Sequence, residues 1–150
     1  MVGQEMIYLC RHGSCENGNL SSKGRAEIQD TARRFLEFTQ SERGPHVSVI
    51  YHGPLPRTVQ SAQELQKILG IEIPMQAEEC IGNEYIEADH AAFDAFIRAI
   101  PAGSLLVTHA QIVKYALQSL CGRDDKTVFP NGGLVAMLRE DSTPWRRRLI

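Results

Sequence analysis

The feature that most constrains the fold is an alternation of two kinds of apolar segment. Short strand-like runs, such as MIYLC at 6–10 and SLLVT at 104–108, are separated by segments whose apolar residues recur every three or four positions. Strand and helix patterns alternate roughly every 20 to 25 residues, which is typical of β-α-β units. The sequence therefore predicts an α/β fold: a three-layer α/β/α sandwich with a mainly parallel sheet, formed by residues 1–150 as a single domain.

The individual elements follow from apolar spacing and from residues that begin or end helices. Helices are expected after Ser21 or Ser22 as the N-cap, before Gly70, before Pro101 and before Gly122. Strands are expected at 6–10, 47–51, 71–75, 104–109 and 133–138, the last of these being the final strand. The RRR run at 146–148 is interpreted as a solvated chain end.

Composition excludes several classes of function. The net charge of -2 argues against a protein that binds nucleic acid. No run of 18 apolar residues indicates a membrane span, and the N-terminus lacks the pattern of a secretory signal. We therefore expect a cytoplasmic protein, monomeric or weakly dimeric. Its cysteines form no CxxC pair and are expected to be reduced: Cys10, Cys15, Cys80 and Cys121.

Polar residues gather just beyond the predicted strands. Arg11 and His12 follow the first strand, His52 and then Arg57 follow the second, and His109 follows SLLVT. Because ligands of such sheets bind beyond the carboxyl ends of the strands, these side chains are expected to meet at one rim.

This set of residues suits phosphoryl transfer. Two guanidinium groups match the oxygens of a phosphoryl group, and a neutral imidazole such as that of His12 can act as a nucleophile. A second, protonated imidazole could donate to an equatorial oxygen in the transition state. Gly13 permits the backbone bend that lets Arg11 and His12 address one ligand.

A metal-independent mechanism is favoured over a metal centre. Aspartate and glutamate are not clustered with histidine at ligand spacing, so no metal ligands and no cofactor are predicted. A covalent phosphohistidine would divide a very slow hydrolysis into two easier steps that use the same cationic clamp.

The motifs that carry these residues resemble the histidine phosphatase (phosphoglycerate mutase-like) superfamily. LCRHG resembles its RHG signature, NLSSKGRAEI its first helix start, IYHGPLPRTVQSAQEL its second-arginine motif, and LLVTHAQIV its second-histidine segment. The four matches occur in the family order over residues 6–117. The resemblance implies the corresponding fold and a phosphohistidine mechanism.

Carried over residue by residue, the resemblance implies a catalytic set. His12 would be the phosphorylated nucleophile, Arg11 and Arg57 phosphate ligands, and His109 the second histidine of the pocket. The family also uses a glutamate that donates a proton to the leaving group. Glu84 fits its spacing best, with Glu79 as the alternative.

The chain departs from the family pattern in its phosphate loop and around the second arginine and histidine. Gly18 stands where many members have asparagine, which makes Asn17 a possible substitute ligand. His52 and Gly53 replace a pair of serines, and Ala110 replaces a glycine. The substrate-binding residues predicted beside the catalytic set are Asn17, His52, Gly13 and Ala110.

The short chain bears on the choice of substrate. Little room exists between the third strand and LLVTH for the cap that many members use to recognise small substrates, so the chain is similar to the compact phosphohistidine phosphatases of the SixA type. A phosphorylated histidine on a protein is therefore the preferred substrate. A small phosphomonoester, such as a sugar or nucleotide phosphate, is the alternative, and a non-catalytic phosphate-binding domain is the rival interpretation. A phosphoglycerate mutase proper is not expected.

Overall fold

A computed structural model of the chain describes residues 5–41, 46–82, 90–122 and 129–150. In chain order the elements are β1 (Met6–Arg11), β2 (Cys15–Glu16), β3 (Asn19–Leu20), α1 (Ser22–Ser41), β4 (Val49–His52), α2 (Pro56–Leu69), β5 (Met75–Ala77), the short 3-10 helix η1 (Glu79–Ile81), α3 (His90–Ala99), β6 (Ser104–Thr108), α4 (Ala110–Cys121), β7 (Leu134–Leu138) and β8 (Arg146–Leu149).

Six of these strands form one mixed sheet in the order β5-β4-β6-β1-β7-β8. The block from β5 to β1 pairs in parallel, whereas β7 and β8 add to it in antiparallel fashion. The predicted mainly parallel sheet is thus confirmed. Because β4, β6 and β1 are neighbours and run in the same direction, their carboxyl ends share one rim.

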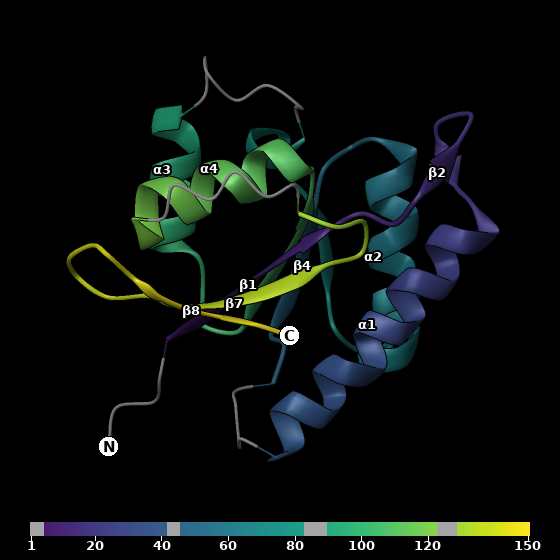
Figure 1. Cartoon of the computed structure of the whole chain (residues 1–150), viewed down its shortest axis with the longest axis horizontal. Coiled ribbons are helices and arrows are strands. Elements are labelled where there is room, and N and C mark those ends of the chain that lie inside the picture. Colours follow the sequence, from purple (N-terminus) through teal and green to yellow (C-terminus); the bar gives the residue numbers. More distant parts are fainter. Residues whose placement is uncertain (1–4, 42–45, 83–89, 123–128) are drawn as a thin grey trace.

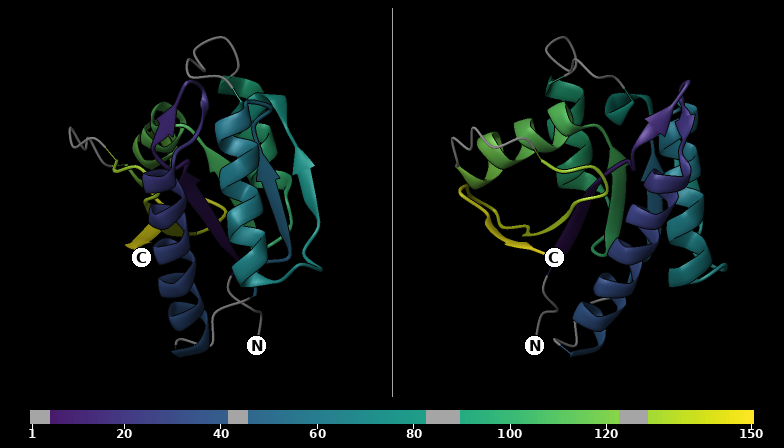
Figure 2. Two further views of the ribbon diagram at one scale, coloured as in Figure 1. Left: turned by 90° about the vertical axis from the view of Figure 1, so that its right-hand side faces the viewer. Right: turned by 45° about the vertical axis from the view of Figure 1, so that its right-hand side comes forward.

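Helices cover both faces of the sheet, as predicted (Figures 1 and 2). On one face Phe35 of α1 and Leu65 of α2 pack with Tyr8 of β1 in one apolar core. On the opposite face Phe93 of α3 and residues of α4 pack in a second core that includes Leu9 of β1. Successive residues of β1 therefore serve opposite cores, which requires the continuous apolar run seen in its sequence.

The predicted helix boundaries have identifiable physical causes. The Ser21 hydroxyl accepts a hydrogen bond from the Gly24 amide at 3.0 Å, which caps the start of α1. Gly122 adopts the left-handed conformation (φ 65°) that ends α4.

Two strand predictions are wrong. Residues 71–74 form a turn, and β5 begins only at Met75, since the Ile73 amide bonds back to the Gly70 carbonyl and Ile71 is exposed. The sheet also continues beyond β7, because the arginine-rich segment at 146–148 belongs to the edge strand β8. Arginines can occupy an edge strand since their stems cover apolar surface, as where Arg148 lies 5.1 Å over the ring of Phe38.

Burial of β1 predicts a loss of stability in alkali. Burial raises the pKa of the Cys10 thiol from 9.0 to about 12, an effect that Arg34 opposes in part. Above pH 9 the unfolded thiol releases its proton while the folded one keeps it, so the free energy of unfolding falls as pH rises towards 12. The slope for this group is about 1.4 kcal/mol per pH unit. Urea unfolding between pH 8 and 11 should show a shallower decline for Cys10→Ala than for the unmodified protein; equal slopes would contradict this assignment.

Candidate active site

Three histidines lie at the carboxyl ends of three adjacent strands. His12 directly follows β1, His52 is the last residue of β4, and His109 directly follows β6. All three side chains are buried, with exposed fractions of 8%, 8% and 2%. The convergence expected from the sequence is therefore present for His12 and His109, whose rings are in contact, whereas His52 lies at the end of the neighbouring strand β4.

His12 is held in one orientation with one tautomer favoured. Its amide donates to the Thr108 carbonyl at 3.0 Å, and its Nδ1 lies 2.8 Å from the Gly13 carbonyl oxygen. Because a carbonyl only accepts hydrogen bonds, Nδ1 must carry the proton. In the neutral ring the lone pair is then on Nε2. The His12 ring also contacts that of His109 edge to face, with centroids 5.1 Å apart and an interplanar angle of 72°.

His109 occupies the junction between β6 and α4. It is the N-cap residue of α4, and its carbonyl accepts hydrogen bonds from the amides of Ile112 and Val113 at 3.1 Å. The junction is also tied to η1, because the Thr108 hydroxyl donates to the Ile81 carbonyl at 2.6 Å. The residues just after β5 are thereby held next to the same rim.

The chain leaves β1 through a tightly packed crossing of two glycine backbones. A Cβ on Gly13 would meet the Gly24 carbonyl oxygen at 2.5 Å, and a Cβ on Gly24 would collide with the Ser14 backbone. The Gly13 amide donates to the Ser61 hydroxyl of α2 at 3.1 Å. These contacts fix the backbone immediately after His12 against α1 and α2.

A polar brace that sequence reasoning missed supports the same loop. The Glu27 carboxylate accepts from the Ser14 amide at 2.8 Å and from its hydroxyl at 3.0 Å, and Asn131 donates to that hydroxyl at 3.1 Å. The Gln60 side chain accepts from the Leu20 amide at 2.6 Å. Glu27 and Gln60 are visible in the sequence as polar residues of helical segments. Because single polar residues on helices usually face solvent, their contacts with the loop could not be inferred.

Arg57 lies in the first turn of α2, above this loop. Ser61, which bonds Gly13, is one turn further along the same helix, so both residues lie on one helical face. The Arg57 side chain is half-buried. Its charge adds to the partial positive charge of the helix N-terminus, a combination that favours an anion at this position.

Arg11, the last residue of β1, has its guanidinium anchored by a neutral group. One of its terminal nitrogens donates to the Phe129 carbonyl, and among the described residues no carboxylate forms an ion pair with it. Burial lowers the pKa of Arg11, while Cys15 and Glu27 raise it. An arginine nevertheless stays protonated, so its charge remains for an anionic ligand.

His52 repeats the arrangement of His12 on the neighbouring parallel strand. Its Nδ1 lies 2.8 Å from the carbonyl oxygen of the following Gly53, so its Nε2 also carries the lone pair in the neutral ring. Thr58 of α2 donates to the same Gly53 carbonyl at 2.8 Å. The role of His52 in substrate binding stays a prediction.

The remaining predicted residues that the structure describes belong to several different elements. Asn17, with φ 53°, is exposed in the turn of the β2-β3 hairpin, a feature the sequence analysis did not predict, and Ala110 is the first residue of α4. Glu79 is exposed in η1, and Glu84 lies outside the described residues.

Within the described part of the chain, no group of histidine, cysteine, aspartate or glutamate could hold a metal ion, and no helix is long and apolar enough to cross a membrane.

Comparison with solved structures identifies the fold. A protein from Agrobacterium tumefaciens described as the phosphohistidine phosphatase SixA superposes with a TM-score of 0.71 at 20% identity, over 100% of this chain and 97% of that one. The protein histidine phosphatase SixA in complex with tungstate gives a TM-score of 0.77 at 16% identity, over 95% and 94%. The Plasmodium falciparum phosphoglycerate mutase gives 0.73 at 19% identity, over 98% and 90%.

No protein-family model and no curated protein sequence matches the chain. The structural matches therefore establish the fold: an α/β fold of the phosphoglycerate mutase-like type, in the compact form seen in SixA. This confirms the fold expected from the resemblance in sequence.

The glycine crossing predicts a sharp contrast between two substitutions. Gly24→Ala should lower the free energy of unfolding by about 3 kcal/mol, because its Cβ meets backbone that cannot move away. Gly18→Ala, with φ 82° but open space around it, should cost only about 1 kcal/mol. Chemical denaturation of both variants tests this, and a Gly24→Ala protein as stable as Gly18→Ala would contradict the crossing.

Proposed function

We propose that the chain is a metal-independent phosphatase that works through a phosphohistidine on His12. The observation that carries the proposal is the contact between Nδ1 of His12 and the Gly13 carbonyl, which leaves the lone pair on Nε2. The adjoining His109 ring and the cationic side chains of Arg11 and Arg57 support the same assignment. The fold shared with SixA and phosphoglycerate mutase agrees with it.

In the proposed first step, Nε2 of His12 attacks phosphorus as the bond from phosphorus to the leaving group breaks. Arg11 and Arg57 bind the phosphoryl oxygens, and a protonated His109 donates to one of them as charge develops. The leaving group takes a proton from an acid. In the second step water attacks phosphorus and gives a proton to the carboxylate left by the acid, while the phosphorus–nitrogen bond breaks. Inorganic phosphate leaves, with His12 and the acid both restored.

The acid is proposed to be Glu84, with Glu79 as the alternative. The hydrogen bond from Thr108 to the Ile81 carbonyl ties the η1 segment to the end of β6, next to His109. A carboxyl group from this part of the chain could therefore reach the leaving group. As a general acid, this carboxyl group would hold its proton until the leaving group departs.

For substrate, we favour phosphohistidine on a protein. The chain spans 97% and 94% of the two SixA structures that it matches, so it shares their compact size. The exposed β2-β3 hairpin beside the loop after His12 would offer contact surface to a protein. A small phosphomonoester is the alternative of the same class, and a phosphate-binding domain without catalysis is the rival.

Trapping the phosphoenzyme tests the mechanism. The protein, incubated without metal with an aryl phosphate and quenched in alkali, should carry one acid-labile phosphoryl group on Nε2 of His12 by mass spectrometry and NMR. His12→Ala should lack it, whereas His46→Ala, which alters an exposed histidine, should retain it. Phosphate binding without adduct or turnover would favour the binding-domain interpretation.

Substrate class is tested by competition. We expect a higher kcat/KM for a histidine-phosphorylated phosphotransfer domain than for sugar or nucleotide monophosphates at the same pH and salt. Hydrolysis of both kinds should disappear in His12→Ala, which separates this activity from a contaminant. A higher kcat/KM for one of the small monoesters would overturn the preference for a protein substrate while leaving the mechanism standing.

A further inference from the structure

The Glu27 carboxylate lies next to the peptide unit that joins Gly13 to Ser14. It accepts a hydrogen bond from the Ser14 amide at 2.8 Å. On the other side of this trans peptide, the Gly13 carbonyl oxygen lies 2.8 Å from Nδ1 of His12. Because the N–H and C=O groups of a trans peptide are held in one plane and point in opposite directions, a single rigid unit connects the carboxylate to the imidazole.

The sequence of α1 brings Glu27 to this peptide. Gly24 and Glu27 are three residues apart and share one helical face. Since Gly24 has no side chain, α1 approaches the Ser14 backbone closely; a Cβ on Gly24 would lie 2.0 Å from the Ser14 carbonyl oxygen. The close approach lets the half-buried Glu27 side chain reach the Ser14 amide. Backbone packing therefore determines where the carboxylate lies.

The other contacts of Glu27 keep its carboxylate directed at Ser14. The second carboxylate oxygen accepts from the Ser14 hydroxyl at 3.0 Å, and Asn131 donates to that hydroxyl at 3.1 Å. Glu27 forms no ion pair with any residue that the structure describes. Its two oxygens are thus both engaged by donors of one residue.

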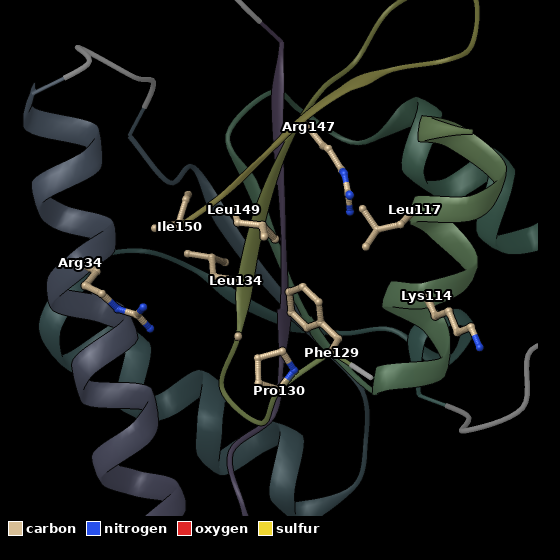
Figure 3. Close-up of a pocket in the computed structure, with 10 residues that line it drawn as sticks. Arg34, Lys114, Leu117, Phe129, Pro130, Leu134, Arg147, Leu149 and Ile150 are labelled. Carbon is tan, nitrogen blue, oxygen red and sulfur yellow. The ribbon is translucent and has the colours of Figure 1, made fainter. Parts of the chain in front are cut away.

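The turn before β7 holds the strand end that carries His12. The Gly132 amide donates to the carbonyl oxygens of both Arg11 and His12 at 3.1 Å. The Thr31 hydroxyl of α1 donates to the Gly132 carbonyl at 2.6 Å. Figure 3 shows Phe129 of this segment beside a cavity of about 330 Å³ between α1 and α4. Because the segment borders a cavity there, its hydrogen bonds to α1 and β1 fix its position.

We propose that Glu27 is a positioning residue for phosphoryl transfer: through the Gly13–Ser14 peptide it holds His12 in the tautomer whose lone pair is on Nε2. A carboxylate that accepts from the Ser14 N–H polarises the whole peptide, which makes the Gly13 oxygen a stronger acceptor. A stronger acceptor favours the ring with its proton on Nδ1. The inference rests on the function proposed for His12, since the Nε2 lone pair is what attacks phosphorus.

His52 provides an internal comparison. Its Nδ1 also lies 2.8 Å from the carbonyl oxygen of the following residue, Gly53. The residue after Gly53 is Pro54, whose nitrogen carries no hydrogen. No carboxylate can therefore act on that peptide as Glu27 acts on the one after Gly13. The chain contains the same contact between histidine and carbonyl with and without a carboxylate behind it.

The tautomer of His12 tests the inference in the absence of substrate. Long-range proton–nitrogen NMR spectra of the unmodified protein, with its imidazoles neutral, should show a proton on Nδ1 of both His12 and His52. In Glu27→Ala the Nδ1-protonated fraction of His12 should fall, while His52 should not change. Ser14→Ala keeps the backbone amide and should leave both histidines as they are. An unaltered His12 in Glu27→Ala, or an equal loss in Ser14→Ala, would overturn the inference.

Kinetics test the consequence for the reaction. Glu27→Ala should lower kcat for an aryl phosphate about tenfold or more and change KM less than about threefold, because the lone pair acts only in the chemical step. Glu27→Gln still offers an oxygen to the Ser14 amide and should recover most of kcat, which a role in proton transfer would not allow. Glu37→Ala makes the same change at an exposed position of α1 and should leave kcat unaltered.

A second route from Glu27 to the site runs through Arg11. Burial lowers the pKa of Arg11, whereas Cys15 and Glu27 raise it, so the carboxylate also acts on a proposed phosphate ligand. An effect of Glu27→Ala confined to KM would assign Glu27 to that route and overturn the inference. No turnover by the unmodified protein would overturn the proposed function, whereas the tautomer measurement would still decide the role of Glu27.

The Glu27→Gln variant keeps the inference testable if Glu27→Ala does not fold, which loss of the His52 signal would reveal. A neutral amide oxygen is a weaker acceptor than a carboxylate. The Nδ1 proton resonance of His12 should therefore shift in Glu27→Gln, while that of His52 stays in place. A His12 resonance that does not move would contradict the proposed link through the peptide.

Discussion

The crossing of the Gly13 and Gly24 backbones governs how this chain presents a histidine. At Gly13 the chain has already left the sheet, since β1 ends at Arg11. A side chain on either glycine would collide with the backbone of the other segment. The close approach brings α1 under the loop and sets the backbone carbonyl of Gly13 against Nδ1 of His12. The tautomer of this imidazole is thus set by a backbone carbonyl, which the close packing of the two glycine segments holds in place.

The rest of the rim is arranged around that imidazole by the order of strands. β6 lies between β1 and β4, so the residue after β6, His109, comes into ring contact with His12 at 5.1 Å. Helix α2 follows β4 and passes over the loop after His12. Its Ser61 hydroxyl accepts a hydrogen bond from the Gly13 amide, and Arg57 lies one turn earlier on the same helix. The parallel sheet therefore supplies the histidines, and the helix that crosses it supplies a cation.

Much of this arrangement could be predicted from the sequence, because strand ends and helix caps are local signals. The alternation of apolar patterns gave the layers, and the rule that ligands lie beyond carboxyl ends gave His12, His52 and His109 a common location. Other parts depend on contacts between distant residues and have no local signature. The brace of Ser14 by Glu27 joins two segments that share no motif. The edge strand β8 was missed because its three arginines read as a solvated terminus, yet its backbone pairs with β7.

A structure of the protein with bound tungstate tests most directly the claim that the rim is a phosphoryl-transfer site. The account predicts the oxyanion within bonding distance of Nε2 of His12, with guanidinium groups of Arg11 and Arg57 on its oxygens and the His109 ring beside it. Nδ1 of His12 should still face the Gly13 carbonyl. Tungstate bound only elsewhere, or an Nε2 atom turned away from the oxyanion, would contradict the account.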